Sequence, residues 1–206
     1  CEKMFKILST ARDYTGLLLL AESVLTVRTK EEIEKTANGF GTDNPFCLSD
    51  LSYTKVFEYL VSVEDEYVEL SLALATKLMG EIVLLGGHEE EESAFPIKET
   101  FYLYDVNFFD LALNQKQALS YRDDVRELAA TIKNLLDRLL GSQCGNREIV
   151  KALYSKYINT LPKSRTMWRL RLYVLSLCPD IFSPELRSAL FSLFETDQYH
   201  EITSGA

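Results

Sequence analysis

The chain has 206 residues, of which 47% are hydrophobic and 26% charged, with 9 glycines and 5 prolines. This composition is that of an ordinary folded protein, and it excludes collagen-like, disordered and low-complexity chains. The 22 Lys and Arg residues stand against 31 Asp and Glu residues, a formal net charge of −9 that disfavours non-specific binding to nucleic acids and membrane surfaces.

The ends of the chain and its apolar runs bear on location. The chain begins at Cys1 rather than Met, and we expect residues 1–206 to form a single domain from a longer protein. No signal peptide is recognisable, and the apolar runs 17–21 and 70–85 are respectively too short and too charged to span a bilayer. The cysteines at positions 1, 47, 144 and 178 form no CxxC pair, which disfavours zinc. We therefore expect reduced thiols, no disulfide, no metal, no cofactor and an intracellular location, cytoplasmic or nuclear.

The first helix signal is the capping box Thr29-Lys30-Glu31-Glu32, which begins a short helix that Asn38-Gly39 ends. Residues 39–48 are expected to form a loop because Asn44-Pro45 blocks a helix. A second helix follows Ser49 or Asp50 and contains Tyr53 to Leu60, and a third restarts at 62–65 with acids in its first turn.

Residues 70–85 are apolar almost all the way round a helical wheel, which predicts a buried central helix ending at Gly86-Gly87. Residues 86–100, with the acidic run Glu89 to Glu92, form a candidate linker; a docking surface for a basic partner is the alternative. Residues 101–104 are a strand or the lead into a helix that Asp105 caps and that contains Phe108.

The strongest amphipathic pattern follows Ser120 and ends at Gly141, with one apolar arc and an opposite charged side. Together with the apolar helix, it predicts a set of nearly fully buried side chains: Leu70, Leu74, Leu78, Leu128, Ile132, Leu135 and Trp168.

The last quarter of the chain has a regular spacing of helix starts. Asn146 caps 147–161, Ser164 caps 165–178, and Ser183-Pro184 begins 184–197. Two such helices make a unit of about 37 residues, a spacing that resembles HEAT and armadillo proteins without a repeated residue signature. We expect an all-α fold of about 9–10 helices, stacked as antiparallel hairpins in a HEAT/armadillo-like right-handed array or arranged as an irregular helical bundle.

No established catalytic or nucleotide-binding motif occurs in the sequence. His88 and His200 are expected on the surface, and Cys144 precedes a helix start but has no neighbouring base in the sequence. The paired acids, Asp123 with Asp124 among them, lie where helix starts and loops explain them. We therefore expect no enzymatic activity.

The informative feature is the segregation of charge. Residues 145–179 hold seven Lys and Arg residues and one acid, a net charge of +6 in a chain of net −9. The basic segment either packs against the acidic middle of the same chain or forms a patch for an acidic peptide, a phosphorylated motif or nucleic acid.

Helical geometry selects the residues of such a patch. Arg165 and Arg169 lie one turn apart on a narrow polar stripe, whereas Arg171 falls inside the apolar arc and needs a carboxylate or helix C-terminal carbonyls as its partner. The candidate partner-binding residues are Arg147, Lys151, Lys163, Arg165 and Arg169.

The leading hypothesis is a non-enzymatic protein–protein interaction domain, a scaffold or adaptor within a larger intracellular protein or complex, that meets an acidic or phosphorylated segment. One alternative is an all-helical exchange or activating factor for a nucleotide-binding partner, an analogy of fold class alone. A weaker alternative is nucleic-acid binding through the C-terminal basic patch; no membrane partner is expected.

Overall fold

The computed structural model describes residues 1–36, 45–48, 53–85, 108 and 124–194. Within these ranges the chain is mostly helical, which confirms the predicted all-α class. The described residues contain no β-strand, although Val27 and Phe46 form one antiparallel bridge beside α3. The candidate linker 86–100, the segment 101–104, His88 and His200 lie outside the described residues.

The helices run in the following order: α1 (Glu2–Thr10), α2 (Tyr14–Val24), α3 (Lys30–Thr36), α4 (Tyr53–Val61), α5 (Val68–Leu85), α6 (Asp124–Gln143), α7 (Arg147–Leu153), α8 (Arg165–Leu177) and α9 (Pro179–Phe194). A 3₁₀ turn, η1 (Asp65–Tyr67), leads into α5, and a π-helical segment, η3 (Tyr154–Ile158), continues α7. We expected one uninterrupted helix over 147–161; the wider π turn closes it at Asn159, whose N–H donates to the carbonyl of Tyr154 over 2.9 Å.

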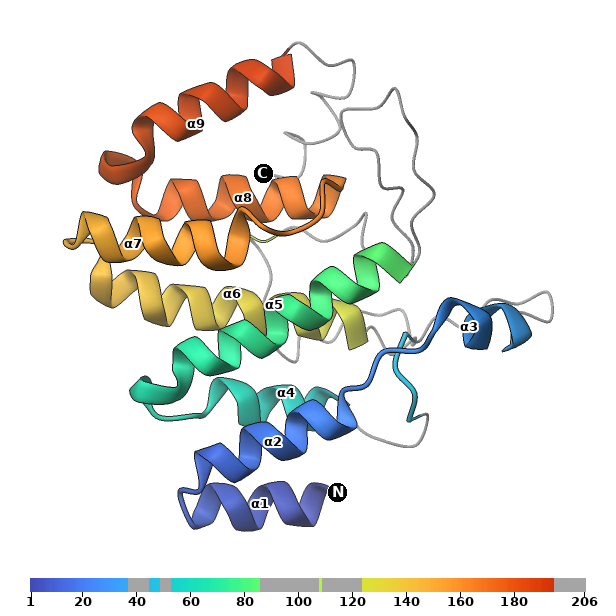
Figure 1. Cartoon of the computed structure of the whole chain (residues 1–206). Helices are drawn as coiled ribbons and strands as arrows, with labels where there is room; N and C mark the ends of the chain where they lie inside the picture. Colours follow the sequence, from blue (N-terminus) through green and yellow to red (C-terminus); the bar gives the residue numbers. More distant parts are fainter. Residues whose placement is uncertain (37–44, 49–52, 86–107, 109–123, 195–206) are drawn as a thin grey trace, which may run out of the picture.

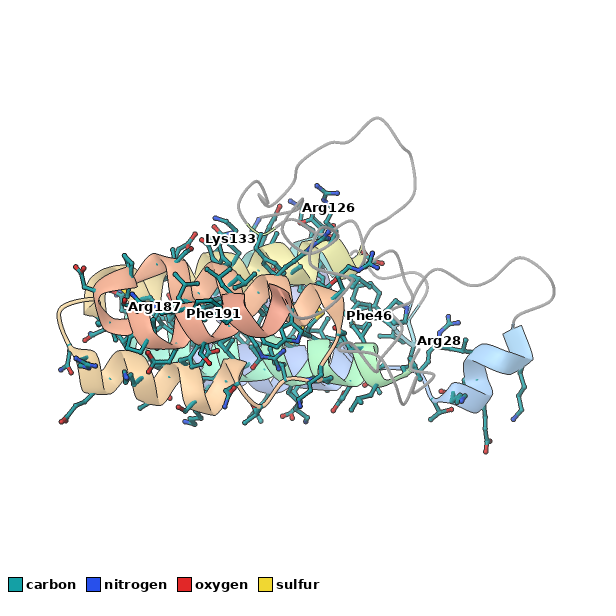
Figure 2. All side chains as sticks on the ribbon, turned by 90° about the horizontal axis from the view of Figure 1, so that it is seen from above. Arg28, Phe46, Arg126, Lys133, Arg187 and Phe191 are labelled. Atoms are coloured by element: carbon teal, nitrogen blue, oxygen red, sulfur yellow. A yellow bond between two sulfur atoms is a disulfide. The ribbon has the colours of Figure 1, made fainter. Side chains whose placement is uncertain are left out.

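Consecutive helices pack as hairpins, and the hairpins stack from α1–α2 at one end to α8–α9 at the other (Figure 1). The first helices of the hairpins, α1, α4, α6 and α8, touch one another in succession, and so do α2, α5 and η3 among the second helices. In Figure 1, α5 crosses in front of α6, and Figure 2 shows α6 and α7 on opposite sides with α9 lying across the end of the stack.

Helix α6 lies at the centre of this stack, in contact with α4, α5, α7 and α8. Leu128, Ile132 and Leu135 on its predicted apolar arc are fully buried, which confirms that part of the core. Ala129, Ala130 and Thr131 are buried as well, so small side chains let neighbours approach other sides of the helix.

The polar side of α6 is satisfied by the neighbouring helices. Arg138 donates to the carbonyls of Val61 (2.5 Å) and Val63 (2.9 Å) at the end of α4 and to the carboxylate of Asp65 (2.7 Å) in η1. These bonds satisfy carbonyls that the end of α4 leaves without helical partners. Asp137 accepts from Lys133 over 2.8 Å and from the Tyr173 hydroxyl, which ties α6 to α8.

The prediction that 70–85 forms the central, fully buried helix is wrong on one side. Leu78 is buried, but Leu70 is 56% exposed and Leu74 is half-buried. Both lie on the stripe of α5 that also carries the exposed Lys77 and Glu81, because α2, α4, α6 and η3 cover only the remaining sides. Trp168, also expected to be nearly fully buried, is half-buried beside a cleft.

The predicted helix starts are confirmed where the side chain caps the helix. Thr29 and Glu32 form the reciprocal bonds of the capping box, and Asn146 and Ser164 each accept a backbone N–H over 3.3 Å. The start at Ser183-Pro184 is wrong: α9 begins at Pro179, whose fixed φ suits the first helical position, and continues through Pro184. The carbonyl of Cys178 accepts from the N–H groups of Ile181 and Phe182 over 3.0 and 3.1 Å.

The expectation of four free thiols is also wrong. Cys144, at the turn between α6 and α7, is bonded to Cys178, at the end of α8, while Cys1 and Cys47 are free and exposed. The stacking of hairpins brings two turns that are 34 residues apart in sequence to a Cα–Cα distance of 5.8 Å, within the usual range for a disulfide. The expectation of an intracellular location depended in part on four reduced thiols, and this bond removes that support.

The assignment of α6 to the centre and of Leu70 to the surface can be tested by two substitutions of the same kind. Leu135→Ala removes buried methyl groups and leaves a cavity, so it should lower the free energy of unfolding by about 2–5 kcal/mol. Leu70→Ala should change it by less than about 0.5 kcal/mol. Urea denaturation followed by circular dichroism measures both, and comparable losses in the two variants would contradict this core.

The disulfide is tested by counting thiols. Titration of the denatured, unreduced chain should give two free thiols rather than four. Replacing both Cys144 and Cys178 with Ala should cost about 3–4 kcal/mol of stability, because the bond closes a 34-residue loop in the unfolded chain. Cys47→Ser, at an exposed free thiol, is the control and should leave stability unchanged.

Candidate partner-binding cleft

The five basic residues selected from the sequence do not form one exposed patch. Arg147 and Lys163 are exposed, and Lys151 and Arg165 are half-buried, but Arg169 is only 7% exposed. Arg169 is therefore a buried residue of α8, not part of an exposed polar stripe. The structure brings Lys151 and Lys163 together in one cleft, and it places Arg165 and Arg169 on a different side of α8.

That cleft has a volume of about 480 Å³ and lies between α7 with η3, α8 and α9. We call it the basic cleft and define it by six of its lining residues: Lys151, Tyr154, Lys163, Trp168, Arg171 and Glu185. Three cations therefore meet one carboxylate, and the cleft carries net positive charge in an acidic chain.

Arg171 is the most deeply placed of these cations, only 6% exposed. One of its nitrogens, Nη2, donates to the carbonyls of Leu161 and Pro162, the kind of partner that its position in the apolar arc predicts. No carboxylate among the described residues pairs with it, and Nη1 is buried without a hydrogen-bond partner. Burial lowers the pKa of Arg171, yet a guanidinium stays charged at neutral pH.

One aromatic ring of the cleft lies over the guanidinium. The Cζ atom of Arg171 lies 5.6 Å from the centroid of the Trp168 ring, a cation–π arrangement. Burial raises the pKa of Tyr154, so its hydroxyl is protonated at neutral pH and available as a hydrogen-bond donor.

Lys151 and Glu185 form an ion pair across the cleft between α7 and α9. This bond to Lys151 holds the pKa of Glu185 below its ordinary value, with smaller contributions from the backbone N–H of Glu185 itself and from the charge of Arg147. The pair uses only one carboxylate oxygen, since Oε2 of Glu185 is buried without a partner. The basic cleft thus contains an unused donor on Arg171 and an unused acceptor on Glu185.

The local sequence builds this geometry from three helix ends. The Asn146 cap begins α7, the π turn of η3 ends it, and the Ser164 cap begins α8 two residues after Pro162. Since Arg171 follows Ser164 by about two turns, its side chain extends back to the carbonyls that precede α8.

A buried guanidinium with a free nitrogen, an exposed lysine at the same cleft and an adjacent phenol are donors suited to a carboxylate or phosphate group. Sequence reasoning found Lys151 and Lys163, and it anticipated the carbonyl partners of Arg171 without assigning Arg171 to a site. It missed Tyr154, Trp168 and Glu185. For Trp168 the signal was its spacing with Arg171 and Leu175, which places the three on one face of α8 but is also typical of a core; the sequence held no such signal for Tyr154 and Glu185.

A second polar cluster joins the basic segment to the acidic middle of the chain. Glu69 on α5 accepts from Lys156 over 2.9 Å and from the Tyr157 hydroxyl over 2.7 Å. This contact is of the kind expected if the basic helices pack against the acidic middle, but it involves only Lys156 of the basic residues. Packing against the acidic middle thus describes Lys156, whereas Lys151 and Lys163 line the basic cleft.

Comparison with known proteins gives no relative, since no family model, no curated protein and no solved structure matches this chain. Among the residues that the structure describes, no helix is long and apolar enough to cross a membrane. The same residues hold no cluster of His, Cys, Asp and Glu side chains suited to a metal ion. Arguments about function therefore depend on the geometry of this chain alone.

The Glu69 cluster gives a pH-dependent prediction. The bonds from Tyr157 and Lys156 hold the pKa of Glu69 below its ordinary value of 4.5, so the carboxylate stabilises the fold at pH values above 4.5. That stabilisation should be lost as the pH falls through the lowered pKa. Glu69→Gln should therefore melt below wild type at pH 7, and the difference, measured by circular dichroism, should shrink as the pH falls below 4.5. A difference independent of pH would mean that the charge of Glu69 contributes nothing.

Proposed function

We propose that this chain is a non-enzymatic protein-interaction domain that binds an acidic or phosphorylated segment of a partner protein in the basic cleft. The observation that carries the proposal is the buried Arg171 guanidinium, which has no carboxylate partner among the described residues and keeps Nη1 without a hydrogen bond. An unpaired buried donor is costly, and an anionic group in the cleft would remove that cost.

The surroundings of Arg171 support a protein segment as the ligand. The cleft combines cations with the aromatic and apolar side chains of Trp168, Phe182 and Leu175, and such a lining accepts a carboxylate or phosphate together with the carbon chain that bears it. The unused acceptor on Glu185 suits a backbone N–H beside the acidic group. A peptide offers both a charged acceptor and such a donor.

The arrangement of helices supports the same class of function. We propose that the stacked hairpins form a HEAT/armadillo-like array, because successive first helices and successive second helices contact each other along the stack. Arrays of this type present long surfaces made of neighbouring helices, which suit a scaffold or adaptor within a larger assembly. The α3 excursion and the π turn are departures from a regular repeat.

Trp168 is the single tryptophan of the chain, so its fluorescence reports on the basic cleft. A pool of twelve-residue peptides rich in Glu and phosphoserine should change the Trp168 emission, and a pool with Gln in place of the acids should not. Lys163→Glu should weaken the response at least about tenfold, because it reverses an exposed charge at the cleft.

The matched control is Arg187→Glu, which reverses another exposed cation on α9. Figure 2 shows Arg187 on the outward side of this helix, and it does not line the basic cleft. If the control weakens binding as much as Lys163→Glu does, the interaction is a general charge effect and the proposal is wrong. An equal response to a dT12 oligonucleotide would also overturn it and favour nucleic acid.

A further inference from the structure

Three clefts of this structure follow one another across the molecule, each sharing lining residues with the next. The first, between α2 and α5, has a volume of about 350 Å³ and shares Ala73 and Lys77 with the second. The second, between α5 and η3, has a volume of about 380 Å³ and shares Leu161 with the basic cleft. We call them the apolar cleft, the middle cleft and the basic cleft, and together the cleft row.

The apolar cleft exposes large hydrophobic side chains. Leu19 on α2 is 64% exposed and Leu70 on α5 is 56% exposed, with Leu18 and Leu74 between them. Its two charged residues, Glu22 and Lys77, pair with each other over 3.0 Å, so this end of the row carries no net charge. The exposed stripe of α5, which the sequence predicts to be buried, forms one wall of this cleft.

The middle cleft is lined where α5 comes close to the chain after η3. A Cβ atom at Gly80 would lie 3.8 Å from side-chain atoms of Leu161 and Pro162, so the absence of a side chain at Gly80 leaves space there. Leu84, 61% exposed, continues the apolar stripe on α5. Lys77 and Lys156 of the middle cleft pair with Glu22 and Glu69, and the exposed Glu81 is negative, so this part of the row offers no cation to an acidic side chain.

We propose that the cleft row binds one extended segment of a partner protein, with apolar side chains in the apolar cleft and an acidic or phosphorylated side chain in the basic cleft. This inference rests on the proposed function and adds the length and the pattern of the partner. Its basis is the change along the row, from a neutral end with exposed leucines to an end with three cations and one acid.

The spacing of the helices sets the length of the segment. Neighbouring packed helices lie about 8–10 Å apart, so three steps, from α2 through α5 and η3 to α9, cover about 25–30 Å. An extended chain advances about 3.3 Å per residue, and about eight or nine residues therefore span the row. A segment shorter than this reaches only one end.

The charge pattern favours an extended segment over a second copy of this chain. A second copy is acidic overall, but it would cover the row with folded helices rather than place an acidic side chain beside the buried Arg171. Extended chain follows a row that crosses the helices, and alternating side chains enter its hollows. A concentration-dependent dimer that Leu70→Asp abolishes would overturn the inference and make the second copy the occupant.

The test uses four pools of synthetic twelve-residue peptides, labelled for fluorescence anisotropy, with the whole 206-residue chain. Two pools join a Leu/Phe-rich half to a Glu/phosphoserine half, one pool in each order. In the third pool Gln replaces the apolar half, and in the fourth Gln replaces the acidic half. One of the two-part pools should bind at least about tenfold tighter than the pool that keeps only the acidic half.

Two variants and their matched controls assign that gain to the cleft row. Leu70→Asp should remove it, whereas Ile7→Asp, an exposed apolar residue of α1 outside the three clefts, should not. Gly80→Phe fills the middle cleft and should also remove the gain, while Gly80→Ala meets only ordinary van der Waals distances and should keep it. Melting curves establish that each variant is folded.

The outcomes separate this inference from the proposed function. If the apolar half adds nothing, or if Ile7→Asp acts like Leu70→Asp, the cleft row is not one site. The proposed function then still stands, provided that binding of the acidic half depends on Lys163. Both proposals are wrong if Lys163→Glu leaves the binding of every pool unchanged. Both are also wrong if no pool binds the folded chain.

Discussion

The packing of α6 on all sides is the constraint on which the rest of the structure depends. Every described side chain from Asp124 to Leu140 is buried or half-buried, and α4, α5, α7 and α8 surround the helix. A helix with charged residues at this depth is possible only if each charge finds a partner. Arg138 binds the carbonyls at the end of α4, and Asp137 binds Lys133 and Tyr173.

This constraint explains why α6, and not α5, is the helix that its neighbours cover on all sides. The apolar content of residues 70–85 predicts the buried centre, and the pattern of 124–140 predicts an amphipathic helix with one face in solvent. In the fold, small residues such as Ala129 and Ala130 let helices approach α6 closely, and Arg138 reaches a neighbouring backbone instead of water. A hydrophobic pattern predicts which face of a helix is apolar and which is polar. It does not predict whether the polar face contacts water or the end of another helix, because that depends on residues distant in sequence.

The elements that sequence reasoning predicted best are those determined within one turn of chain. Thr29, Asn146 and Ser164 cap helices through bonds to residues three positions away, and their neighbourhood contains all the information needed. The turn between α1 and α2 shows the limit of such signals. Arg12 has a positive φ of 56° and closes a Schellman motif, a position that glycine usually occupies. The sequence therefore contains no glycine that would predict this turn.

The candidate site was predictable only in part for the same reason. Lys151 and Lys163 belong to a basic segment visible in the sequence, and the need of Arg171 for carbonyl partners followed from its place in an apolar arc. That Arg171, Glu185 and Trp168 meet in one cleft required knowing that α9 begins at Pro179 and lies across α7 and α8. The pairing of Cys144 with Cys178 likewise depended on which turns lie at the same end of the stack.

The disulfide also divides the molecule mechanically. The covalent ring from Cys144 to Cys178 contains α7, η3 and α8, and therefore all three cations of the basic cleft, while α9 and the N-terminal hairpins lie outside it. Tension applied between the chain ends extends only the residues outside the ring. An oxidised molecule stretched between its termini is thus shorter than a reduced one by about 110 Å, the extended length of the 34-residue separation less the 5.8 Å that the disulfide bridges.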